Sequence, residues 1–403
     1  MLTKKHVIAA TLVTLFASYP VLAASYSFQD LYTLGVPAGS DFAGATFISP
    51  FSAGPGGQIV GGADNAGVGT GATAMIWSTT TPSGTSLATD QYAVGTNGNE
   101  QVGYGSSALS TIGSGALLWS GTAASKVDLS PVVVVSGIPV VEWYFSLAYA
   151  VENGQQVGVG ELVHPGASHA LLWSGTGTSF VDLHPAGFSN SEAHGLYSDP
   201  NPLGVRQQVG FGLNTLANQV HALLWTGTAA SAVDLNPSGF GYSHAVGTDG
   251  VQQVGYGDDV HGQSHALLWT GTAQSAVDLG PGTALAINHG MEVGLAGQNV
   301  DQASTGNVTI WSGSAASAVN LSALMPSTFF VPYEGINSLA NAPLYLDANG
   351  NVFGYALDNS TQLYHAIEFS PVPEPSSAAI GISAVLTLLV CLLRREVRNA
   401  RFG

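Results

Sequence analysis

The stretch QVGYGDDVHGQSHALLWTGTAQSAVDL, residues 253–279, decides the fold. It holds three short apolar segments separated by Gly, Asp, Ser and Thr. Its Ala-Leu-Leu-Trp segment ends at Trp269, and similar segments recur along the chain. Their last residues, which we call the anchors, follow one another at intervals of 42 to 58 residues: Trp77, Trp119, Trp173, Trp225, Trp269, Trp311 and Phe369. The chain therefore contains a repeat of seven units.

The order of segments within a unit is constant. Ser/Thr-Gly-Thr follows the anchor, then Val-Asp-Leu, an Ala-x-Gly step, Gln-Val-Gly-x-Gly and the next His-Ala-Leu-Leu-Trp. Short apolar or alternating segments bounded by turn residues are typical of β-strands. We see no amphipathic helix between the two ends of the chain, and Trp143 falls outside the register of the anchors.

Four strands in 40 to 50 residues are the pattern of a β-propeller blade. The sequence predicts an all-β domain over 24–370, built as a seven-bladed β-propeller. We expect each anchor Trp to pack between adjacent sheets, and the glycines of Gln-Val-Gly-x-Gly to let strands approach closely near the axis. A β-solenoid is the alternative fold, although its coils are usually shorter.

The repeats resemble the HAF family of bacterial extracellular repeats, named for a His-Ala-Phe core. The core reads His-Ala-Leu at 169–171, 221–223 and 265–267, and His-Ala-Ile at 365–367. The downstream Asp-Leu and Gln-Val-Gly segments match as well, over roughly 28–370. The resemblance implies an extracellular repeat domain and names no activity.

The N-terminus has the three parts of a secretory signal. Lys4 and Lys5 precede an apolar run from Val7 to Phe16, and Val21-Leu-Ala23 offers small residues for a signal peptidase. We predict a signal peptide over 1–23 with cleavage after Ala23, or alternatively after Ala24.

The C-terminus carries a different signal. A Pro-rich spacer (371–377) leads into an uncharged span (378–393) and a basic tail (394–403). The span is slightly short of the ~17–25 residues usual for a transmembrane helix, and the arginines favour a cytoplasmic end. Together with Pro373, Glu374 and Pro375, this order resembles the PEP-CTERM sorting signal. The resemblance implies processing by an exosortase in a bacterium that makes exopolysaccharide, with the protein held transiently in the membrane.

The segment between the two signals is strongly acidic. It holds 24 of the 25 acidic residues but only Lys126 and Arg206 as basic ones, which gives a net charge near −22. Nucleic acid is an unsuitable partner, because its phosphates need a basic footprint. The single cysteine, Cys391, lies in the C-terminal span, so the domain has no disulfide and no cysteine-based metal site.

The recurrent polar residues favour structural roles. Histidine recurs four residues before the anchor (His169, His221, His265, His365), and aspartate recurs in Val-Asp-Leu (Asp128, Asp182, Asp234, Asp278). We expect the histidines to hydrogen-bond a neighbouring turn and the aspartates to cap turns through backbone N–H groups. Asp347-Ala-Asn-Gly-Asn351 could be a calcium loop or a hairpin turn, and the turn is favoured. We predict no catalytic, cofactor or metal residues.

Two insertions interrupt the repeat, Pro131–Phe145 and Leu321–Asn341. Insertions in repeat proteins often form the binding face. We therefore expect a ligand surface from five aromatic residues within them, Trp143, Tyr144, Phe329, Phe330 and Tyr333; packing between blades is their alternative role. The predicted function is a non-enzymatic surface or matrix module that binds exopolysaccharide or a surface protein. A purely structural component and a polysaccharide hydrolase or lyase remain the alternatives.

Overall fold

The computed structural model describes residues 25–36, 47–64, 72–107, 109, 113–135, 138–140, 143–163, 166–201, 203–297, 306–332 and 343–372. This part is all-β, as predicted, with antiparallel sheets joined by turns and three-residue 3-10 helices. In these ranges no helix has the length and apolarity to cross a membrane. The predicted signal peptide, the sorting motif Pro373–Pro375 and the span 378–393 lie outside them.

Four sheets consist of four consecutive antiparallel strands each. The first contains β2 (Phe47–Ala53), β3 (Ile59–Asp64), β4 (Thr73–Ser78) and β5 (Thr81–Ala88), and the second contains β6 (Gln91–Thr96), β7 (Gln101–Ser106), β8 (Ser114–Trp119) and β9 (Val127–Asp128). The third contains β12 (Trp143–Glu152), β13 (Gln155–Leu162), β14 (Ser168–Trp173) and β15 (Val181–Asp182). The fourth contains β16 (Phe188–Ser198), β17 (Arg206–Asn214), β18 (Gln219–Trp225) and β19 (Val233–Asp234).

A larger sheet repeats this pattern twice, because one long strand serves both halves. β23 pairs with β22 through its first residues and with β24 through its last ones. The strands are β20 (Phe240–Thr248), β21 (Gln253–Asp259), β22 (Ser264–Trp269), β23 (Val277–Asn288), β24 (Met291–Ala296), β25 (Asn307–Trp311) and β26 (Val319–Asn320).

The last sheet joins the two ends of the domain. The N-terminal strand β1 pairs with the C-terminal strand β30, from Tyr26 opposite Pro371 to Thr33 opposite His365. Its strands are β1 (Tyr26–Thr33), β30 (Leu363–Pro371), β29 (Val352–Asp358), β28 (Leu344–Leu346) and β27 (Phe329–Phe330), and a separate hairpin contains β10 (Val133–Val135) and β11 (Ile138–Val140).

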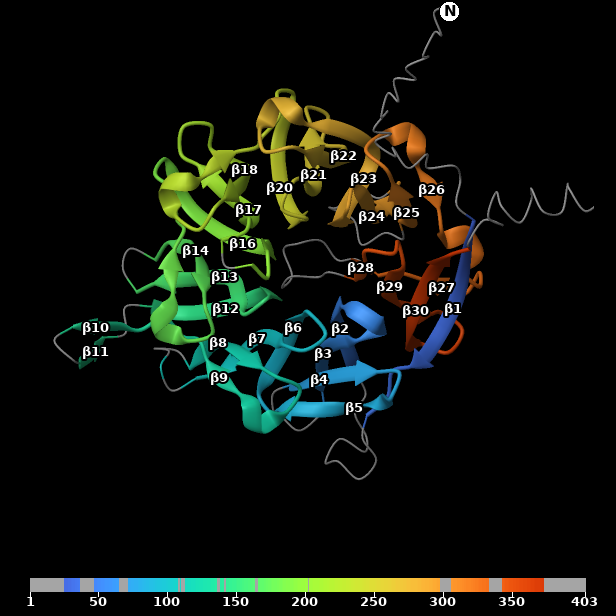
Figure 1. The fold of residues 1–403 in the computed structure, drawn as a ribbon, viewed down its shortest axis with the longest axis horizontal. Helices are drawn as coiled ribbons and strands as arrows, with labels where there is room; N and C mark the ends of the chain where they lie inside the picture. The colour runs from blue at the N-terminus through green and yellow to red at the C-terminus, as the bar shows by residue number, and fades with distance from the viewer. Residues whose placement is uncertain are drawn as a thin grey trace, which may run out of the picture.

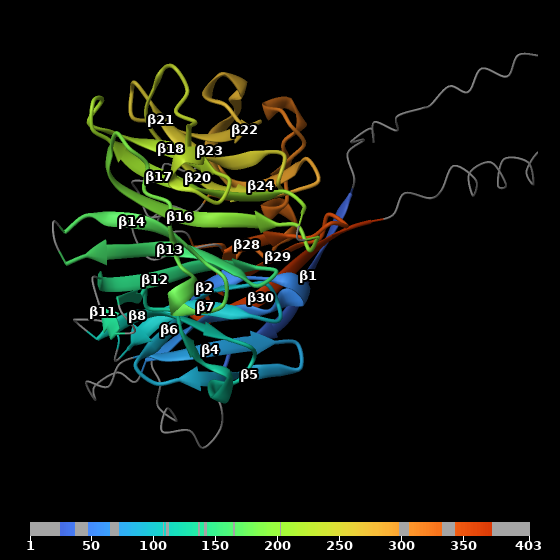
Figure 2. The ribbon, with the colours of Figure 1, turned by 60° about the vertical axis from the view of Figure 1, so that its left-hand side comes forward.

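The sheets follow one another around a common centre, with their first strands innermost (Figure 1). Seen from the side, those strands run along the axis, and the start of β1 lies on the same side of the ring as the end of β30 (Figure 2). This is the arrangement of a β-propeller. The 3-10 helices mark the turns: η1 (Pro55–Gly57), η2 (Ala123–Ser125), η3 (Gly177–Ser179), η4 (Ala229–Ser231), η5 (Ala273–Ser275), η6 (Ala315–Ser317) and η7 (Ser322–Leu324).

The sequence unit and the sheet differ by one strand. In β16–β19 the order is Ala-x-Gly, Gln-Val-Gly-x-Gly, His-Ala-Leu-Leu-Trp and then Val-Asp, so the short Val-Asp strand completes the sheet of the preceding anchor. In the last sheet that position is taken by Asp30 of β1. Asp30, which lies near the start of the domain, therefore belongs to the last sheet of the ring.

The anchors pack between adjacent sheets, as predicted. Trp119 lies in a cluster with Val60 and Ile76 of the preceding sheet, and Trp225 lies with Val157 and Leu172. Trp77, the anchor of the first complete sheet, packs with Tyr355 and Ala366 of the last one. All seven anchors, Phe369 included, are at most 2 % exposed. The ring of sheets is therefore closed by side-chain packing as well as by β1.

The glycine of Gln-Val-Gly allows two strands to approach closely, as predicted. A Cβ on Gly210 would overlap the carbonyl oxygen of Glu192, and one on Gly255 would overlap that of His244. Both carbonyls belong to the innermost strand of the same sheet. The neighbouring innermost strand therefore imposes the need for glycine.

Trp143 is in register with the repeat, contrary to the sequence interpretation. It opens β12 opposite Leu162, as Phe188 opens β16 and Phe240 opens β20. The 131–145 insertion is instead the β10–β11 hairpin, which projects outward from the ring (Figure 1).

Candidate functional site

The innermost strands share one irregularity, a β-bulge at the Ala-x-Gly step or its equivalent. Their pairing shifts across Pro50/Ser52, Ala93/Gly95, Ala148/Ala150, Ala193/Gly195, Ala245/Gly247 and Ala284/Ala286. A bulge adds one residue that the partner strand does not match, and it redirects that residue's side chain. The added residues of four consecutive innermost strands line a central cavity: Tyr149, His194, Val246 and Leu285.

The glycine of this step brings neighbouring sheets together. A Cβ on Gly95 would overlap the carbonyl oxygen of Tyr149 in the next sheet, and a Cβ on Gly195 would overlap that of Val246. The bulge of one sheet therefore sits directly against the glycine of the sheet before it. This contact fixes how closely the innermost strands surround the centre.

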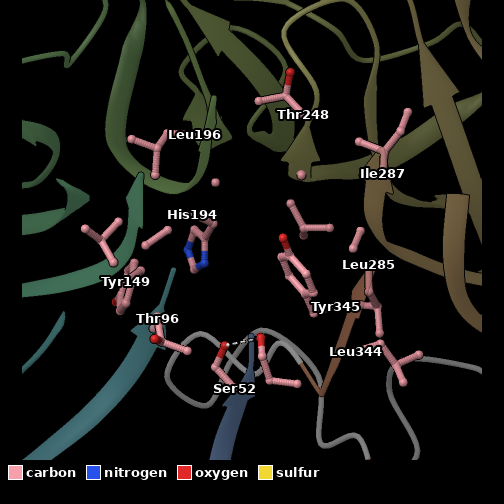
Figure 3. A pocket seen from close by; sticks show the side chains of 18 residues that line it. Ser52, Thr96, Tyr149, His194, Leu196, Thr248, Leu285, Ile287, Leu344 and Tyr345 are labelled. Carbon is pink, nitrogen blue, oxygen red and sulfur yellow. Dashed lines mark hydrogen bonds between the residues drawn. The ribbon is translucent and has the colours of Figure 1, made fainter. Parts of the chain in front are cut away.

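The central cavity has a volume of about 190 Å³ and is lined by residues of seven innermost strands, β2, β6, β12, β16, β20, β23 and β28. Side chains converge on it from all sides, with Leu196, Ile287 and Leu344 among hydroxyl groups and the His194 ring (Figure 3). The lining is thus mainly apolar with a few polar groups.

One acid–base cluster borders this cavity. Tyr149 Oη donates to Glu192 Oε2 at 3.3 Å, and His194 Nε2 lies 3.2 Å from the same oxygen. The Tyr149 and His194 rings stack with centroids 4.6 Å apart. Burial, and then the Glu192 carboxylate, raise the pKa of Tyr149 well above its ordinary value. Tyr149 is therefore a hydrogen-bond donor here and not a base.

A second cavity, which we call the mouth cavity, has a volume of about 660 Å³. It lies where the innermost strands turn into their partners, and it shares Leu196, Thr248, Ala286, Ile287 and Tyr345 with the central cavity. Its further lining includes Glu152, Tyr197, Asp249, Gln252, Asn288 and His289. The two cavities therefore form one continuous path along the axis.

The mouth cavity is acidic. Burial, and then the Glu100 carboxylate, raise the pKa of Glu152. Burial, followed by Glu152 and Asp347, raises the pKa of Tyr345. No lysine or arginine is among the residues that line the cavity. Carboxylates thus dominate the field at this end of the axis.

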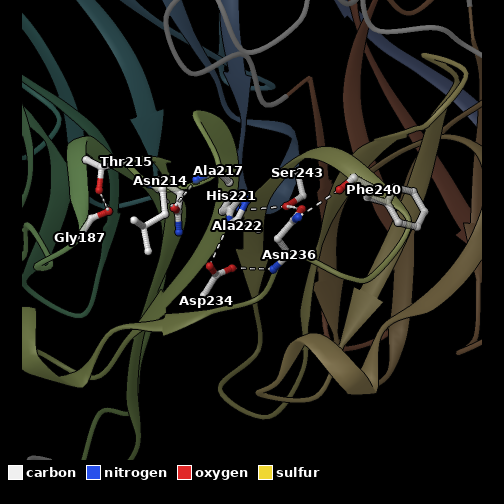
Figure 4. Close-up of polar contacts among 11 residues, drawn as sticks. Gly187, Asn214, Thr215, Ala217, His221, Ala222, Asp234, Asn236, Phe240 and Ser243 are labelled. Carbon is white, nitrogen blue, oxygen red and sulfur yellow. Dashed lines mark hydrogen bonds and ion pairs between the residues drawn. The ribbon is translucent and has the colours of Figure 1, made fainter.

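The recurrent histidines pair with the recurrent aspartates. Nδ1 of His221 lies 2.7 Å from Oδ2 of Asp234, whose Oδ1 accepts the N–H of Asn236 at 2.9 Å (Figure 4). The equivalent pairs are His169–Asp182, His265–Asp278 and His365–Asp30. The aspartates cap turns as predicted, but the histidines bind these carboxylates across the sheet rather than a turn. Their repetition on separate sheets indicates a structural role.

Each of these histidine rings also meets an aromatic ring from the start of an innermost strand or its equivalent. The centroid distances are 5.8 Å for Trp143–His169, 6.4 Å for Phe188–His221, 5.9 Å for Phe240–His265 and 4.8 Å for Phe329–His365. Trp143 and Phe329 therefore occupy matching positions in the repeat.

The four described aromatic residues of the expected ligand surface are not brought together. Trp143 is only 4 % exposed, whereas its neighbour Tyr144 is 41 % exposed. Phe329 and Phe330 are half-buried on β27, in a sheet across the ring from β12 (Figure 1). Tyr333 lies outside the described residues. The packing role suits Trp143 and Phe329, and a ligand role stays a prediction for Tyr144.

Sequence reasoning missed the residues that line the axis. The informative signal was position x of the Ala-x-Gly step, which varies among units while its neighbours stay small. Two mouth residues, Tyr197 and Asp249, follow that step by two positions. Tyr345 lies in β28, which has no such step. Nothing in the chain order shows that they converge.

The Asp347–Asn351 segment is the turn between β28 and β29. Asp347 Oδ1 accepts the N–H groups of Asn349 and Asn351, both at 2.8 Å, and Oδ2 accepts from the Asn351 amide. The carboxylate is therefore engaged in capping this turn, in keeping with the hairpin interpretation. Across the described ranges, no three His, Cys, Asp or Glu side chains are grouped to hold a metal ion.

No family model and no curated protein matches the chain. Solved structures are similar in shape only. The β-propeller domain of the Trilobed protease from Pyrococcus furiosus has 9 % identity and a TM-score of 0.48, covering 82 % of this chain and 95 % of that one. TolB from Acinetobacter baumannii has 8 % identity and a TM-score of 0.37, covering 85 % and 96 %.

A prolyl endopeptidase structure has 10 % identity and a TM-score of 0.44 over 79 % of this chain; the chain spans 46 % of that protein's length. Likenesses at this level carry no argument about what this chain does. The description as a β-propeller rests on its own sheets.

Proposed function

We propose that the chain is an exported surface or extracellular-matrix protein whose seven-bladed, closed β-propeller binds polysaccharide without transforming it. The sequence ends support export, with removal of 1–23 and sorting by an exosortase-type enzyme that recognises Pro373–Pro375. Until that processing, 378–393 holds the protein in the membrane. Seven innermost strands around one cavity support the blade count.

The observation that carries polysaccharide binding is the mouth cavity. Its volume of about 660 Å³ falls in the ~300–1,000 Å³ range of small-molecule sites. It combines the rings of Tyr197 and Tyr345 with carboxylate, amide and imidazole groups. Aromatic faces suit the apolar faces of sugar rings, and these polar groups suit their hydroxyls.

Isothermal titration calorimetry of the 24–372 segment against a panel of bacterial exopolysaccharides tests this function. Calorimetry is preferable to Trp fluorescence, because the seven tryptophans are at most 4 % exposed. Tyr345→Ala and Tyr197→Ala should each weaken binding about ten-fold or more. Tyr144→Ala, on the opposite end of the axis, is the matched aromatic control.

Loss of binding in Tyr144→Ala with retention in Tyr345→Ala would move the site to the β10–β11 side. Absence of a binding heat with every polysaccharide would leave the structural and protein-partner alternatives.

Export is tested separately by mass spectrometry. The secreted protein should begin at Ala24. Alanine substitution of Pro373–Pro375 should leave the C-terminal segment unprocessed.

Acid–base chemistry is a second candidate, favoured by the Tyr149–Glu192–His194 cluster. Glutamate, histidine and tyrosine are general acids and bases. Tyr149 and His194 line the central cavity, and both contact the Glu192 carboxylate. That cavity, at about 190 Å³, is smaller than usual ligand sites. Release of reducing ends or unsaturated products from exopolysaccharide, abolished by His194→Ala, would establish this alternative.

A further inference from the structure

The charge of the mouth cavity narrows the kind of sugar that it can hold. Glu152 and Asp249 contribute carboxylates to its wall, and no lysine or arginine does so. Of the two basic residues between the signals, Lys126 lies between η2 and β9, and Arg206 opens β17 as an exposed residue outside the lining. An acidic sugar would therefore meet like charge here, with no lysine or arginine among the described lining residues to offset it and His289 as the basic side chain of this wall.

Asp249 keeps one carboxylate oxygen for a ligand. Its Oδ1 accepts the N–H groups of Val251 at 3.0 Å and Gln252 at 2.8 Å, which fixes the β20–β21 turn. Among the described residues, none donates a hydrogen bond to Oδ2. The turn thus orients a charged oxygen at the cavity wall without neutralising it.

Within the described residues, the Glu152 carboxylate has no basic partner either. Its Oε1 accepts a hydrogen bond from the Asn153 amide at 3.1 Å. Burial and Glu100 both disfavour its ionised form. A cation bound in the cavity would relieve both effects, since an opposite charge within a few ångströms stabilises a carboxylate.

Two tyrosine rings complete a wall that suits a cation. The Tyr197 ring is held against the β20–β21 turn, where a Cβ on Gly250 would lie 2.5 Å from it. Tyr345 lies close enough to Glu152 and Asp347 for both carboxylates to affect its hydroxyl. Aromatic faces beside carboxylates attract ammonium groups through cation–π and Coulomb interactions.

We propose that the mouth cavity binds an amine-bearing sugar unit, a hexosamine with a free ammonium group, at Asp249 and Glu152 between the rings of Tyr197 and Tyr345. The proposal rests on the sugar-binding function proposed above. It specifies the ligand of that same cavity, namely a partly or fully deacetylated amino-sugar polymer rather than a uronate polymer.

The test compares short oligomers that differ in the substituent at C2 of the sugar ring, which is an ammonium group in one of them and a neutral group in the other two. Glucosamine tetramer, N-acetylglucosamine tetramer and a neutral glucose tetramer are titrated into the 24–372 segment by calorimetry, in mildly acidic buffer at low and moderate salt. We expect the Kd of the glucosamine tetramer to be lower than that of the other two by about ten-fold or more. Salt should weaken this preference, because it screens the charges.

Isosteric variants locate the effect. Asp249→Asn and Glu152→Gln keep an oxygen acceptor for the local hydrogen bonds and remove the charge, so each should lower the preference several-fold. Asp259→Asn is the matched control. Asp259 caps the β21–β22 turn at the other end of the same sheet, where its Oδ1 accepts from His261 and Gln263. The Asp259→Asn substitution removes the same net charge and should leave the preference for the glucosamine tetramer unchanged.

The outcomes separate the two proposals. Equal binding of the three tetramers would overturn the amine assignment and leave the sugar-binding function in place. Binding of none would overturn the amine assignment, and the exopolysaccharide panel would then decide the sugar-binding function separately. A preference lost equally in Asp259→Asn and Asp249→Asn would also overturn the assignment, because it would reflect the overall negative charge. A preference lowered in Asp249→Asn and in Glu152→Gln but kept in Asp259→Asn would establish it.

Discussion

At the level of single residues, Glu292 departs from a repeated glutamine position. In four sheets a buried glutamine accepts the N–H of the glycine after the anchor, as Gln208 does from Gly227 at 2.7 Å. In β24 that position is Glu292, which accepts from Gly313 at 2.9 Å and is fully buried. Burial, opposed by the Gly313 N–H and reinforced by Asp249, raises the pKa of Glu292 to about 7.

Glu292→Gln should stabilise the protein at neutral and alkaline pH. Since the folded-state pKa lies above 4.5, the folded state binds more protons and the free energy of unfolding falls as the pH rises from about 4.5 to about 7. The loss amounts to about 3 kcal/mol. Thermal unfolding of Glu292→Gln should show a higher Tm at pH 8 and no gain at pH 4. Glu161→Gln removes the same charge from a partly exposed site and controls for net charge.

Gly210→Ala should destabilise the protein by roughly 1–3 kcal/mol or more. The new methyl group would overlap the carbonyl oxygen of Glu192, a backbone atom that cannot move without shifting β16. Gly241→Ala is the comparison, because its methyl group would be 3.6 Å from the nearest atom, the Gln219 amide. Urea unfolding of both variants measures the difference; equal midpoints would refute the close-approach account.

At the scale of elements, serines on the innermost strands tie each sheet to the one before it. Ser243 Oγ accepts the N–H of Ala222 at 2.9 Å and donates to Asn236 Oδ1 (Figure 4). Ser146 and Ser191 accept from Ala116 and Ala170 in the same way. These bonds complement the Trp clusters, because they satisfy backbone groups that face the neighbouring sheet.

Ser243→Ala should lower the free energy of unfolding by about 1–3 kcal/mol, since it leaves the buried Ala222 N–H without an acceptor. Ser189→Ala on β16, whose hydroxyl is exposed, should change it by less than about 0.5 kcal/mol. Chemical denaturation with both variants measures this difference. A Ser243→Ala protein as stable as the parent would argue against the inter-sheet hydrogen bond.

At the scale of the molecule, closure depends on pairing between chain ends. β1 contributes Phe28 to the contact with Phe369, at a centroid distance of 5.5 Å, and Asp30 to the bond with His365. Leu34 is buried beside it, and its N–H binds the carbonyl of Tyr364 at 2.8 Å. Because the last sheet lacks its outer strand without β1, the ring should not be stable as a shorter chain.

A chain that starts at residue 37 should therefore lose the cooperative thermal transition of the 24–372 segment. A synthetic peptide of residues 25–36, added in excess, should restore it by occupying the edge of β30. Differential scanning calorimetry checks both. A cooperative transition without the peptide would mean that closure does not depend on β1.

The repeat, the all-β class and the packing of the tryptophans could be predicted from the sequence alone, because alternating apolar patterns and turn residues involve only residues close together in the chain. The sequence also placed strands at Val-Asp-Leu, Ala-x-Gly, Gln-Val-Gly and the anchor. It misplaced Trp143, since a hairpin insertion hid the register of β12.

Only the tertiary structure decided which strands share a sheet and which side chains reach the axis. The pairing of Asp30 with His365 joins residues 335 positions apart, and no local pattern encodes it. The mouth cavity likewise takes Glu152, Tyr197, Asp249 and Tyr345 from four different sheets. Their convergence follows from closing the ring, because closure alone brings the ends of all innermost strands to one place.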